Sequence, residues 1–581
     1  RGYDSVGFAV IDRDGQIIVS KAKGKIDDLY ERLGFEKFDG LSGIGHTRWA
    51  THGSINDINA HPHTDCNRCI AIVHNGVIQN YDILKDSLVR EGHIITSETD
   101  TELIAHLLEK YLHYFNGDML RAIREVMRLI TGTYALVILY CKEPERIYFA
   151  KRVSPLIIGL GNDFNVISSD IPAIIDYTKK IIVLEDGEYG FLTPNKVYVY
   201  DVEDKLINLE ERIRFIDWDY RDIEKGGYRH YMLKEIYEQP YSIEQTLMGL
   251  PDQINNINIL DLFLRSDRIF ITGSGSSYHA GLVLDYALKK YLGLLSIPFI
   301  SSEVGLLKNI FREGDLLIAI SQSGETIDTL KAVRIAKSRG AIVLAISNVI
   351  DSTIPRESNF KIYTRAGPEI GVAATKTFTT QIAVGLFIVF RLLEKLSISK
   401  ANNYLRDLMN IPNIMMSVLR SVDIEAKELA EKLRDRSSMY VLGRGLSYPI
   451  SLEGALKIKE ISYIHAEAYP AGESKHGPIA LVEKDFPVFF TVIDDEDDNE
   501  LILGNIEEMR ARNAYVISIA PENHIRVHRL SHYVIKLPRL QGLNASLLSI
   551  IPYQFLSYHL AVARGYDPDK PRNLAKTVTV E

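Results

Sequence analysis

The sequence is poor in cysteine and has no long apolar run. Its three cysteines, Cys66, Cys69 and Cys141, are too few for the disulfide framework of a small secreted protein, so we expect a reducing, cytoplasmic setting. The longest uncharged apolar run, Ile382 to Phe390, has nine residues, whereas a membrane-spanning helix needs about 20. The run therefore predicts a buried core helix. No signal segment precedes it, and no membrane partner is predicted.

An excess of positive charge is also missing. Lys and Arg number 67 against 76 Asp and Glu, which gives a net charge of −9, so no nucleic-acid partner is predicted. A chain of 581 residues is long enough for about three or four packed units. The first residue is Arg1 rather than methionine, which suggests a start inside a longer chain.

The first 200 residues alternate short β-rich runs with turn signals. AIVHNGVI and YALVILYC are examples, and helical patterns occur only near residues 83–91 and 101–129. Many strands with few helices predict an α+β layer structure. A polar, charge-rich stretch at residues 215–240 follows, which we interpret as a linker into the second half.

The second half has a different texture and repeats itself. Apolar runs of five to seven residues alternate with helical patterns, as a buried parallel sheet requires. FITGSGSSYHA at 270–280 matches YVLGRGLSYPI at 440–450, and two later strands repeat at similar offsets. Two α/β subdomains of common design are therefore predicted, with a ligand site where strand ends meet helix starts.

Two loops of this half suit a phosphate group. A Gly/Ser-rich turn at Ser276 and Ser277 follows the first strand, and SQSGET at 321–326 follows another. Free backbone N–H groups at a helix start and neutral hydroxyl or amide side chains can hold a phosphate monoester. A helix cap formed by Ser321 or Ser323 is the simpler alternative. The SQSGET string resembles the phosphate loop of sugar isomerase (SIS) domains.

Longer motifs identify a family. EIGVAATKTFTTQ at 369–381, LEGALKIKEISYIHAEAYPAGESKHGP at 452–478 and PRNLAKTVTVE at 571–581 resemble the isomerase half of glutamine:fructose-6-phosphate aminotransferases, the glucosamine-6-phosphate synthases. TRWATHG at 47–53, HNG at 74–76 and SETDTE at 97–102 resemble their glutaminase half. The resemblance implies an incomplete N-terminal nucleophile-type glutaminase domain of αββα layers, followed by two doubly wound α/β SIS subdomains. We expect the boundaries 1–214 (glutaminase), 215–240 (linker), 241–408 (first SIS), 409–565 (second SIS) and 566–581 (catalytic tail).

The resemblance also implies the reaction and the residues of the sugar site. Members make glucosamine 6-phosphate from fructose 6-phosphate and glutamine (EC 2.6.1.16), the first step toward UDP-N-acetylglucosamine, without cofactor or metal. Glu460 matches the base for the proton shift between C1 and C2, with Lys457 one turn earlier as an assistant. His476 matches the ring-opening residue, which the neighbouring subunit of a homodimer contributes, and Lys576 matches the lysine that forms an imine. The phosphate and the sugar would contact Ser276, Ser277, Ser321, Gln322, Ser323, Thr326, Val372 and Ala373.

The glutamine site is implied in the same way. Arg48 matches the residue that binds the glutamine carboxylate, and Asp100 matches the partner of its α-amino group. Asn75 and the N–H of Gly76 match an oxyanion hole. Three further residues of the same loop match the site, Trp49, Thr51 and His52, with Trp49 as a gate of the ammonia channel.

One family feature has no counterpart in the sequence as given. The nucleophile of the family is an amino-terminal cysteine, and Arg1 corresponds to a position about 25 residues after it. We therefore expect this chain to use ammonia rather than glutamine. His61, His63, Cys66 and Cys69 have types and spacing that suit zinc, but two thiols are the preferred interpretation and no metal is predicted. The alternatives in function are a glucosamine-6-phosphate deaminase or sugar-phosphate isomerase, and a non-catalytic sugar-phosphate sensor.

Overall fold

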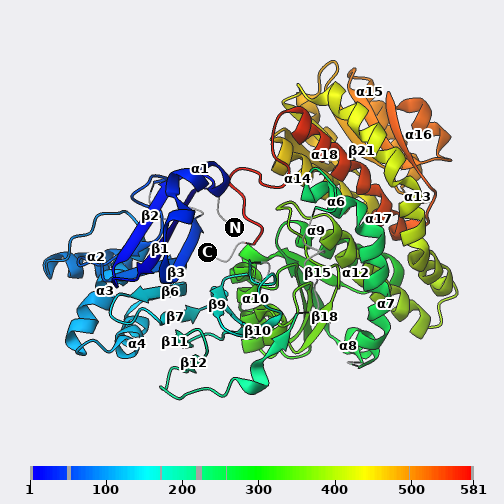
Figure 1. The fold of residues 1–581 in the computed structure, drawn as a ribbon. Coiled ribbons are helices and arrows are strands. Elements are labelled where there is room, and N and C mark those ends of the chain that lie inside the picture. Colours follow the sequence, from blue (N-terminus) through cyan, green and yellow to red (C-terminus); the bar gives the residue numbers. More distant parts are fainter. Residues whose placement is uncertain are drawn as a thin grey trace. The chain divides into compact units, whose positions relative to one another are not determined.

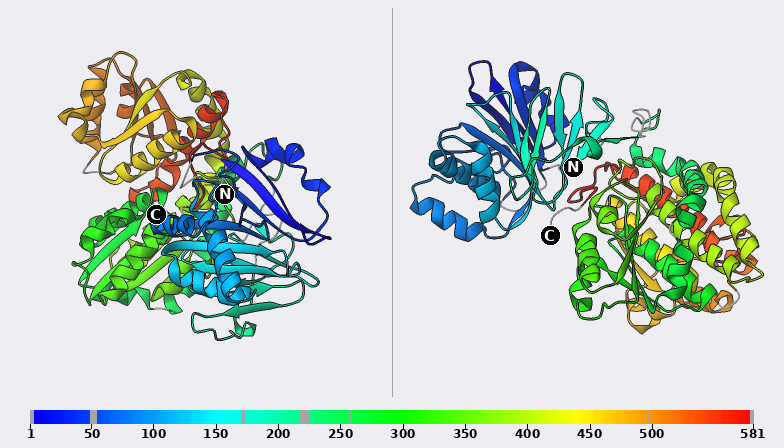
Figure 2. Two further views of the ribbon diagram at one scale, coloured as in Figure 1. Left: turned by 90° about the vertical axis from the view of Figure 1, so that its left-hand side faces the viewer. Right: turned by 90° about the horizontal axis from the view of Figure 1, so that it is seen from below.

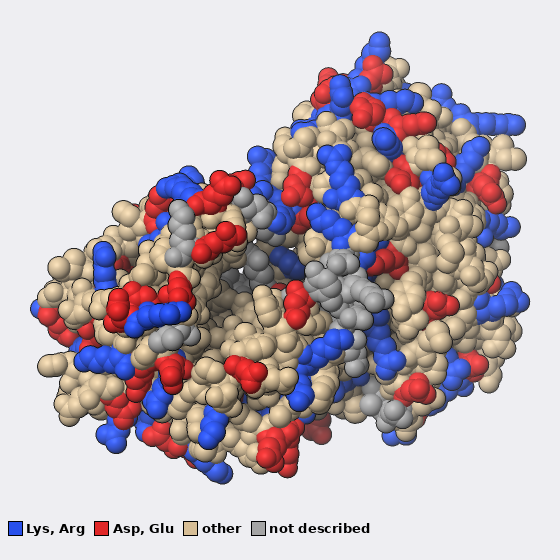
Figure 3. Space-filling view, viewed as in Figure 1, with Lys and Arg blue, Asp and Glu red and all other residues tan. Residues whose placement is uncertain are grey.

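The structure, a computed structural model, describes residues 4–48, 54–170, 173–216, 225–256, 258–495 and 498–577. It divides into two compact units (Figure 1), unit 1 with Arg1–Asp222 and Thr577–Glu581, and unit 2 with Ile223–Lys576. On the face that Figure 3 shows, Lys and Arg are interspersed with Asp and Glu on each unit.

Unit 1 consists mostly of short strands. Its strands are β1 (Ser5–Asp12), β2 (Ile17–Lys23), β3 (Gly40–Arg48), β4 (His63–Thr64), β5 (Ile70–Ile78), β6 (Gly132–Tyr140), β7 (Ile147–Arg152), β8 (Ile157–Leu160), β9 (Asn165–Ser168), β10 (Lys180–Val183), β11 (Tyr189–Leu192), β12 (Val197–Tyr200) and β13 (Arg214–Phe215). Its helices are α1 (Ile26–Leu33), α2 (Tyr81–Arg90), α3 (Asp100–Tyr114) and α4 (Met119–Leu129). The helical pattern expected at 101–129 is thus two helices, which Asn116 and Gly117 separate at positive φ.

The strands of unit 1 form three sheets, ordered β2-β1-β3, β13-β10-β8-β9 and β12-β11-β7-β6-β5-β4. Strand β1 shows how they stack, because successive side chains of a strand point to opposite faces. Ala9 and Ile11 join a core with Val73 and Val137 of the six-stranded sheet, while Val6 and Phe8 pack against α1. Helices α2, α3 and α4 cover the other face of the six-stranded sheet. The predicted αββα layering is confirmed, and Figure 2 shows the blue strands against the cyan ones.

Unit 2 alternates strands and helices. Its first half contains α6 (Tyr231–Tyr237), α7 (Gln239–Asn256), α8 (Ile259–Arg265), β14 (Arg268–Gly273), α9 (Ser276–Leu292), β15 (Ser296–Ile300), β16 (Asp315–Ser321), α10 (Ile327–Ser338), β17 (Ile342–Ser347), α11 (Thr353–Glu357), β18 (Phe360–Tyr363) and α12 (Lys376–Lys395). Its second half contains α13 (Ala401–Leu433), β19 (Ser438–Gly443), α14 (Tyr448–Ser462), β20 (His465–Pro470), β21 (Pro487–Thr491), α15 (Asn499–Arg510), β22 (Tyr515–Pro521), α16 (Ile525–Leu530), β23 (Tyr533–Leu537), α17 (Ser546–Ser549) and α18 (Ile551–Ala563).

The two halves have the same sheet. One is ordered β15-β14-β16-β17-β18 and the other β20-β19-β21-β22-β23, and every pair in both is parallel. Helices lie on both faces of each sheet (Figure 2). This order puts the first strand of each half beside the third, which opens a crevice at the carboxyl ends of the two strands. The duplication predicted from the sequence is confirmed, and β14 and β16 end in the two loops expected to bind phosphate.

Helix α12 lies in the core of unit 2. It is the one helix within the described ranges that is long and apolar enough to cross a membrane, and 89% of its apolar window is buried inside the protein. Both of its faces pack against protein, since α7, α9 and α13 all contact it. The prediction of a buried core helix at residues 382–390 is confirmed.

The segment expected to be a linker is partly helical. Residues 217–224 lie outside the described ranges, but α6 covers much of the rest, and its Met232 and Ile236 belong to the core of unit 2. Asp569 fixes the start of α6, because its carboxylate accepts hydrogen bonds from the N–H groups of Tyr231 and Met232, both at 2.8 Å. The interpretation of residues 215–240 as a linker was therefore wrong where α6 lies, because this helix belongs to the core of unit 2.

Candidate active sites

The loop after β16 is folded by its own hydroxyl groups. The Ser321 and Thr326 hydroxyls are 3.0 Å apart, and the N–H of Gly324 donates to Ser321 Oγ at 3.1 Å. Ser323 Oγ accepts from the N–H of Glu325 at 3.1 Å. Thr326 occupies the N-cap position of α10, although its side chain makes no capping hydrogen bond. The alternative in which Ser321 or Ser323 caps the helix was therefore wrong.

Asn348 connects this loop to the segment before α12. Its N–H donates to the carbonyl oxygen of Gln322 at 3.1 Å. Its side-chain oxygen accepts from Thr364 Oγ1 at 2.9 Å and from the N–H of Ala366 at 2.8 Å, and its Nδ2 donates to the Gly367 carbonyl at 2.8 Å. The predicted phosphate loop is thus held against residues 364–367, which lead into the EIGVAATK segment.

Replacing Gly324 with alanine is expected to disrupt this loop. Gly324 has a φ of +66°, and a Cβ atom there would lie 1.8 Å from Ser352 Oγ. We expect affinity for a sugar phosphate to fall by about 1.4 kcal/mol or more, which is about tenfold or more in Kd, measured by calorimetry. Gly340→Ala is the control, because Gly340 also has positive φ (+84°) but its Cβ would meet nothing closer than 3.5 Å. Equal affinity for both variants would contradict the assignment of this loop.

The two serines at the start of α9 are engaged with other side chains. Ser276 Oγ donates to Glu453 Oε1 at 2.8 Å and accepts from Lys457 Nζ at 3.2 Å. Ser277 Oγ accepts from Gln381 Nε2 of α12 at 3.2 Å. Because Glu453 and Lys457 are on α14, Ser276 joins the two halves of unit 2. Both serines therefore stand in a polar network beside the loop after β14.

A buried set of charges lies along one face of α14. Lys457 Nζ is 2.6 Å from Glu460 Oε2 and 3.3 Å from Glu453 Oε1, and the Lys457 side chain is fully buried. Burial acts to lower the pKa of Lys457, but the carboxylates of Glu453 and Glu460 outweigh it and raise the pKa above its usual value. Lys457 is thus a permanent cation that holds Glu460, rather than a base.

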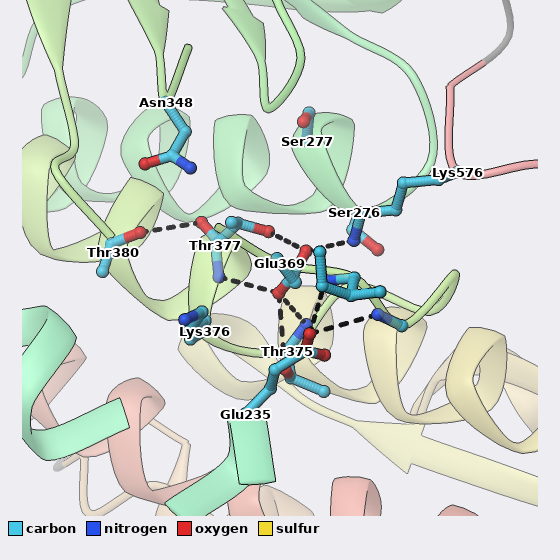
Figure 4. Close-up of polar contacts among 12 residues, drawn as sticks. Glu235, Ser276, Ser277, Asn348, Glu369, Thr375, Lys376, Thr377, Thr380 and Lys576 are labelled. Atoms are coloured by element: carbon cyan, nitrogen blue, oxygen red, sulfur yellow. Dashed lines mark hydrogen bonds and ion pairs between the residues drawn. The ribbon is translucent and has the colours of Figure 1, made fainter. Parts of the chain in front are cut away.

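Lys576 reaches a buried carboxylate. Its ammonium pairs with Glu369 Oε2, and Figure 4 shows Glu369 at the centre of these contacts. Thr377 Oγ1 donates to the same oxygen at 2.6 Å, and the N–H of Thr375 donates to Oε1 at 2.8 Å. Burial favours the protonated form of Glu369, but the Lys576 charge and these hydrogen bonds lower its pKa to about 2. The tail lysine is therefore fixed at a defined position in unit 2.

Glu235 of α6 lies beside this pair (Figure 4). Its Oε1 accepts from the N–H groups of Ile370 and Gly371, and its Oε2 is buried without a hydrogen-bond partner among the described residues. Burial and the negative charge of Glu369 raise its pKa to about 7. A carboxyl group near neutrality beside an amine can exchange a proton with it.

The remaining residues predicted for the sugar site are Val372, Ala373 and His476. Val372 donates its N–H to the carbonyl of Asp569 at 3.1 Å, and Ala373 is buried in the core, so the strand-to-helix segment lies against the C-terminal tail. His476 is exposed in a short 3₁₀ turn. Within the described part of unit 2, no hydrogen bond or ion pair joins it to the other predicted residues.

Arg48 and Asp100 lie near each other in unit 1. Arg48 ends β3 and is 4% exposed, and Asp100 is the first residue of α3 and also 4% exposed. Burial lowers the pKa of Arg48, and the nearby carboxylate of Asp100 opposes this. Asp100 Oδ2 accepts from the N–H of Ile78 at 2.8 Å, which ties the helix start to the end of β5. Trp49, Thr51 and His52 lie outside the described residues.

Asn75 and Gly76 lie on β5 next to a group of histidines. His46 Nε2 donates to Asn75 Oδ1 at 2.9 Å, which leaves the amide nitrogen of Asn75 as the donor toward a ligand. Gly76 has a φ of +142°, and a Cβ there would lie 2.0 Å from the Thr133 carbonyl oxygen, so this position requires glycine. The ring of His46 stacks on His61 with centroids 4.3 Å apart. Burial lowers the pKa of His46 to about 4.

These histidines predict a loss of stability in mild acid. Burial also holds the pKa values of His61 and His63 well below 6.5. Below pH 6.5 the unfolded chain binds protons that the folded chain does not, so stability is complete above pH 6.5 and falls toward pH 4. Each such histidine adds about 1.4 kcal/mol per pH unit to the slope of the free energy of unfolding against pH. Denaturant unfolding between pH 8 and 4.5 measures this. His63→Gln is expected to lower this slope by the contribution of about one histidine, and an unchanged slope would contradict the prediction.

The cysteines correct one expectation. Cys69 and Cys141 form a disulfide, and Cys66 is exposed as a free thiol, so Cys66 and Cys69 are not two thiols. His61 and His63, proposed as alternative zinc ligands with them, are buried side chains, and His63 Nε2 is 2.9 Å from Thr99 Oγ1. They are packing residues.

Three carboxylates of unit 2, Glu235, Glu369 and Glu453, were missed by sequence reasoning. Glu369 and Glu453 both lie within quoted motifs but were given no role. A signal was present for Glu453, because it precedes Lys457 by four residues and so shares its helix face. Glu369 had no such signal, since its partner Lys576 is 207 residues away.

Comparison with known proteins adds to this geometry. A SIS domain model matches residues 262–391 and 432–564, and a glutamine amidotransferase domain model matches residues 46–176. The chain is 48% identical to the "glutamine--fructose-6-phosphate aminotransferase [isomerizing]" of Pyrobaculum aerophilum, across the whole of this chain and 95% of that protein. The proteins of the same name from Sulfurisphaera tokodaii and Aquifex aeolicus are 47% and 45% identical, across the whole of this chain and 95% and 96% of theirs.

Among solved structures, the C-terminal domain of glucosamine-fructose-6-phosphate aminotransferase from Francisella tularensis is similar to 60% of this chain. The similarity covers all of that domain, with a TM-score of 0.56 and 39% identity. Tagatose-6-phosphate ketose/aldose isomerase from Escherichia coli matches 59% of this chain and 95% of its own, with a TM-score of 0.51 and 20% identity. At that identity the match shows a shared fold.

Proposed function

Because the chain belongs to the family of the isomerizing glutamine--fructose-6-phosphate aminotransferases, we propose that it makes D-glucosamine 6-phosphate and L-glutamate from D-fructose 6-phosphate and L-glutamine. This is the reaction EC 2.6.1.16. The observation that carries the proposal is the pairing of Lys576 with the buried Glu369. A phosphate-binding fold alone needs no such lysine, whereas amine transfer through an imine does.

The phosphate of the sugar is assigned to the loop after β16. Ser321, Gln322, Ser323 and Thr326 are neutral donors at the start of α10, where the helix also presents free N–H groups. Ser276 and Ser277 border the site from the start of α9. Asn348 holds this loop against the segment that carries Val372 and Ala373, which we assign to the sugar itself.

Lys576 is assigned the role of nucleophile. Its amine attacks C2 of the open ketose, and a water molecule leaves as the imine forms. The amine must first lose a proton, and Glu235 is suited to receive it, since burial raises the pKa of Glu235 to about 7. Glu369 orients the lysine and neutralises its charge before the reaction. Glu369 is thus a positioning group for the amine, and Glu235 is its proton acceptor.

Glu460 is assigned the proton transfer between C1 and C2. Its side chain is 20% exposed and is held by Lys457 at 2.6 Å, so it is directed by a fixed cation yet open to a ligand. A positioned carboxylate that takes a proton from one carbon and returns it to the neighbouring carbon performs the isomerisation. His476 is assigned to ring opening.

The glutamine end is assigned to unit 1. Arg48 binds the α-carboxylate, and Asp100 binds the α-amino group. Asn75 Nδ2 and the Gly76 N–H stabilise the oxyanion, with His46 fixing the amide of Asn75 through a 2.9 Å hydrogen bond. Trp49, Thr51 and His52 belong to the same proposal, although they lie outside the described residues.

The proposal is tested by supplying fructose 6-phosphate with either glutamine or ammonium and measuring glucosamine 6-phosphate by mass spectrometry. Product from either donor supports aminotransfer. A deaminase would instead release ammonium from glucosamine 6-phosphate far faster than it forms that sugar. No product in either direction, with binding of fructose 6-phosphate intact, would favour a sensor and contradict the proposal.

A cytoplasmic homodimer is part of the proposal. It is supported by the exposed His476, which would then serve the site of the neighbouring subunit. Sedimentation of the purified chain tests the dimer, and a monomer that is fully active would contradict the sharing of His476.

A further inference from the structure

Four side chains with metal-binding atoms converge in unit 1, away from the glutamine residues assigned above. Cys66 lies in the loop after β4, His93 in the turn after α2, and His106 and Glu109 on α3. The Cys66 sulfur is 3.4 Å from His106 Nδ1 and 3.8 Å from His93 Nδ1. Glu109 Oε2 is 3.1 Å from His93 Nδ1 and 3.5 Å from His106 Nδ1.

These spacings fit the ligand shell of a small cation. Zinc binds nitrogen and oxygen at about 2.0–2.2 Å and sulfur at about 2.3 Å, so neighbouring atoms of a tetrahedral site lie about 3.3–3.7 Å apart. The four measured distances run from 3.1 to 3.8 Å. All four ligand atoms lie within 4.8 Å of one another. The side chains therefore need only small shifts to enclose one ion.

Surrounding groups hold these side chains in place. Asn67 Nδ2 donates to Glu109 Oε1 at 2.7 Å, so Oε2 faces the cluster, where the Cys66 N–H also reaches it at 3.4 Å. Asp65 Oδ1 accepts from the N–H groups of Cys69 and Ile70 at 2.7 and 2.8 Å, which closes the loop. The Cys69–Cys141 disulfide ties the loop to the residue that follows β6. The second ring nitrogen of His106 lies 3.9 Å from Glu102 Oε1, beyond hydrogen-bond distance, and is buried without a hydrogen-bond partner among the described residues.

The chemistry of the set selects the ion. One thiolate, two imidazole nitrogens and one carboxylate suit zinc, whereas magnesium and calcium prefer all-oxygen sites. Four protein ligands leave no open coordination position, so the ion would be structural. Hydrogen bonding among these side chains accounts for their arrangement less well than a bound metal ion does, because the thiol and both imidazoles meet around the same carboxylate oxygen.

We propose that Cys66, His93, His106 and Glu109 bind one structural zinc ion. The ion joins the loop after β4 and the turn after α2 to the middle of α3. Asp100, assigned to the glutamine amino group, is the first residue of that helix. The zinc therefore braces the helix that carries a substrate-binding residue, without touching the reaction.

The test is zinc content in the full-length chain. After loading with zinc and exhaustive buffer exchange, elemental analysis is expected to find about one zinc per chain. Cys66→Ala with His106→Ala is expected to retain less than about a tenth of that. His113→Ala is the matched control, since His113 is an exposed histidine two turns further along the same helix, and it is expected to retain the full amount.

A second measurement does not depend on how the double variant folds. Cobalt loaded in place of zinc is expected to give a thiolate-to-cobalt charge-transfer band in the wild type, and Cys66→Ser alone is expected to abolish it. Bound zinc is also expected to protect Cys66 from a thiol reagent. Zinc below about a tenth of an equivalent in the wild type, or a cobalt band unchanged in Cys66→Ser, would overturn the proposal.

Discussion

Lys576→Arg is expected to reduce glucosamine 6-phosphate formation by at least about a thousandfold with either nitrogen donor, the scale of losing a covalent nucleophile. Arginine keeps the positive charge that pairs with Glu369, so the buried carboxylate stays neutralised and the fold is retained. The guanidinium cannot lose its proton in a protein, and therefore no imine forms. The rate is measured at saturating fructose 6-phosphate, with the melting temperature as the check on folding.

Trapping identifies the same residue directly. Borohydride added during turnover is expected to reduce the imine and leave a sugar phosphate attached to the peptide that contains Lys576. Lys484→Arg, a change at an exposed lysine of the same unit, is the control and is expected to be trapped as efficiently as the wild type. An adduct on another lysine, or more than about a tenth of the activity in Lys576→Arg, would show that the assignment is wrong.

Glu460→Gln is expected to reduce the rate by about 10² to 10⁴, the usual contribution of a general base. Imine formation at Lys576 is expected to survive, because the amide keeps the shape of the side chain and Lys457 retains Glu453 at 3.3 Å. The two variants should thus fail at different steps. Quenched-flow trapping measures the imine, and deuterium uptake from heavy water into the sugar measures the proton shift.

A neighbouring carboxylate provides the control for this prediction. Glu473 is exposed at the start of the 3₁₀ turn that ends at His476, and Glu473→Gln is expected to leave both the rate and the deuterium uptake within about twofold of wild type, as for most surface changes. If Glu460→Gln exchanges deuterium as fast as the wild type, Glu460 is not the base. If it also forms no imine, its role is to organise the site through Lys457.

Much of the architecture followed from the sequence because the signals for it are local. The continuously apolar runs of the second half are enough to predict parallel strands, since such strands are buried on both faces. The repeat at Gly273 and Gly443 predicted two sheets of one design, and both have the same order. The apolar run at residues 382–390 predicted a core helix because no charged face is left for solvent. The loop after β16 was likewise recognised from a contiguous string, and its assignment to phosphate stays a prediction.

The side-chain partners across the sites were not predictable in this way. Lys576 meets Glu369, and Ser276 meets Glu453 from a distance of 177 residues. The sequence offered Cys69 and two nearby histidines only as a rejected alternative set of neighbours for Cys66, yet Cys66 lies beside His93 and His106 from later elements. Helical or strand periodicity indicates which face of an element is buried, but it carries no information about the element that will cover that face.

The sequence by itself therefore determined the two sheets of unit 2, the loops at their strand ends and the motifs that identify the family. Only the tertiary structure decided which charges are neutralised. Lys457 became a buried cation between two carboxylates, and Glu235 acquired a pKa near 7 beside Glu369. The physical reason is that a buried charge is stable only when an opposite charge or a set of hydrogen bonds compensates the loss of water. In this protein those partners come from distant segments, and only the closed fold brings them together.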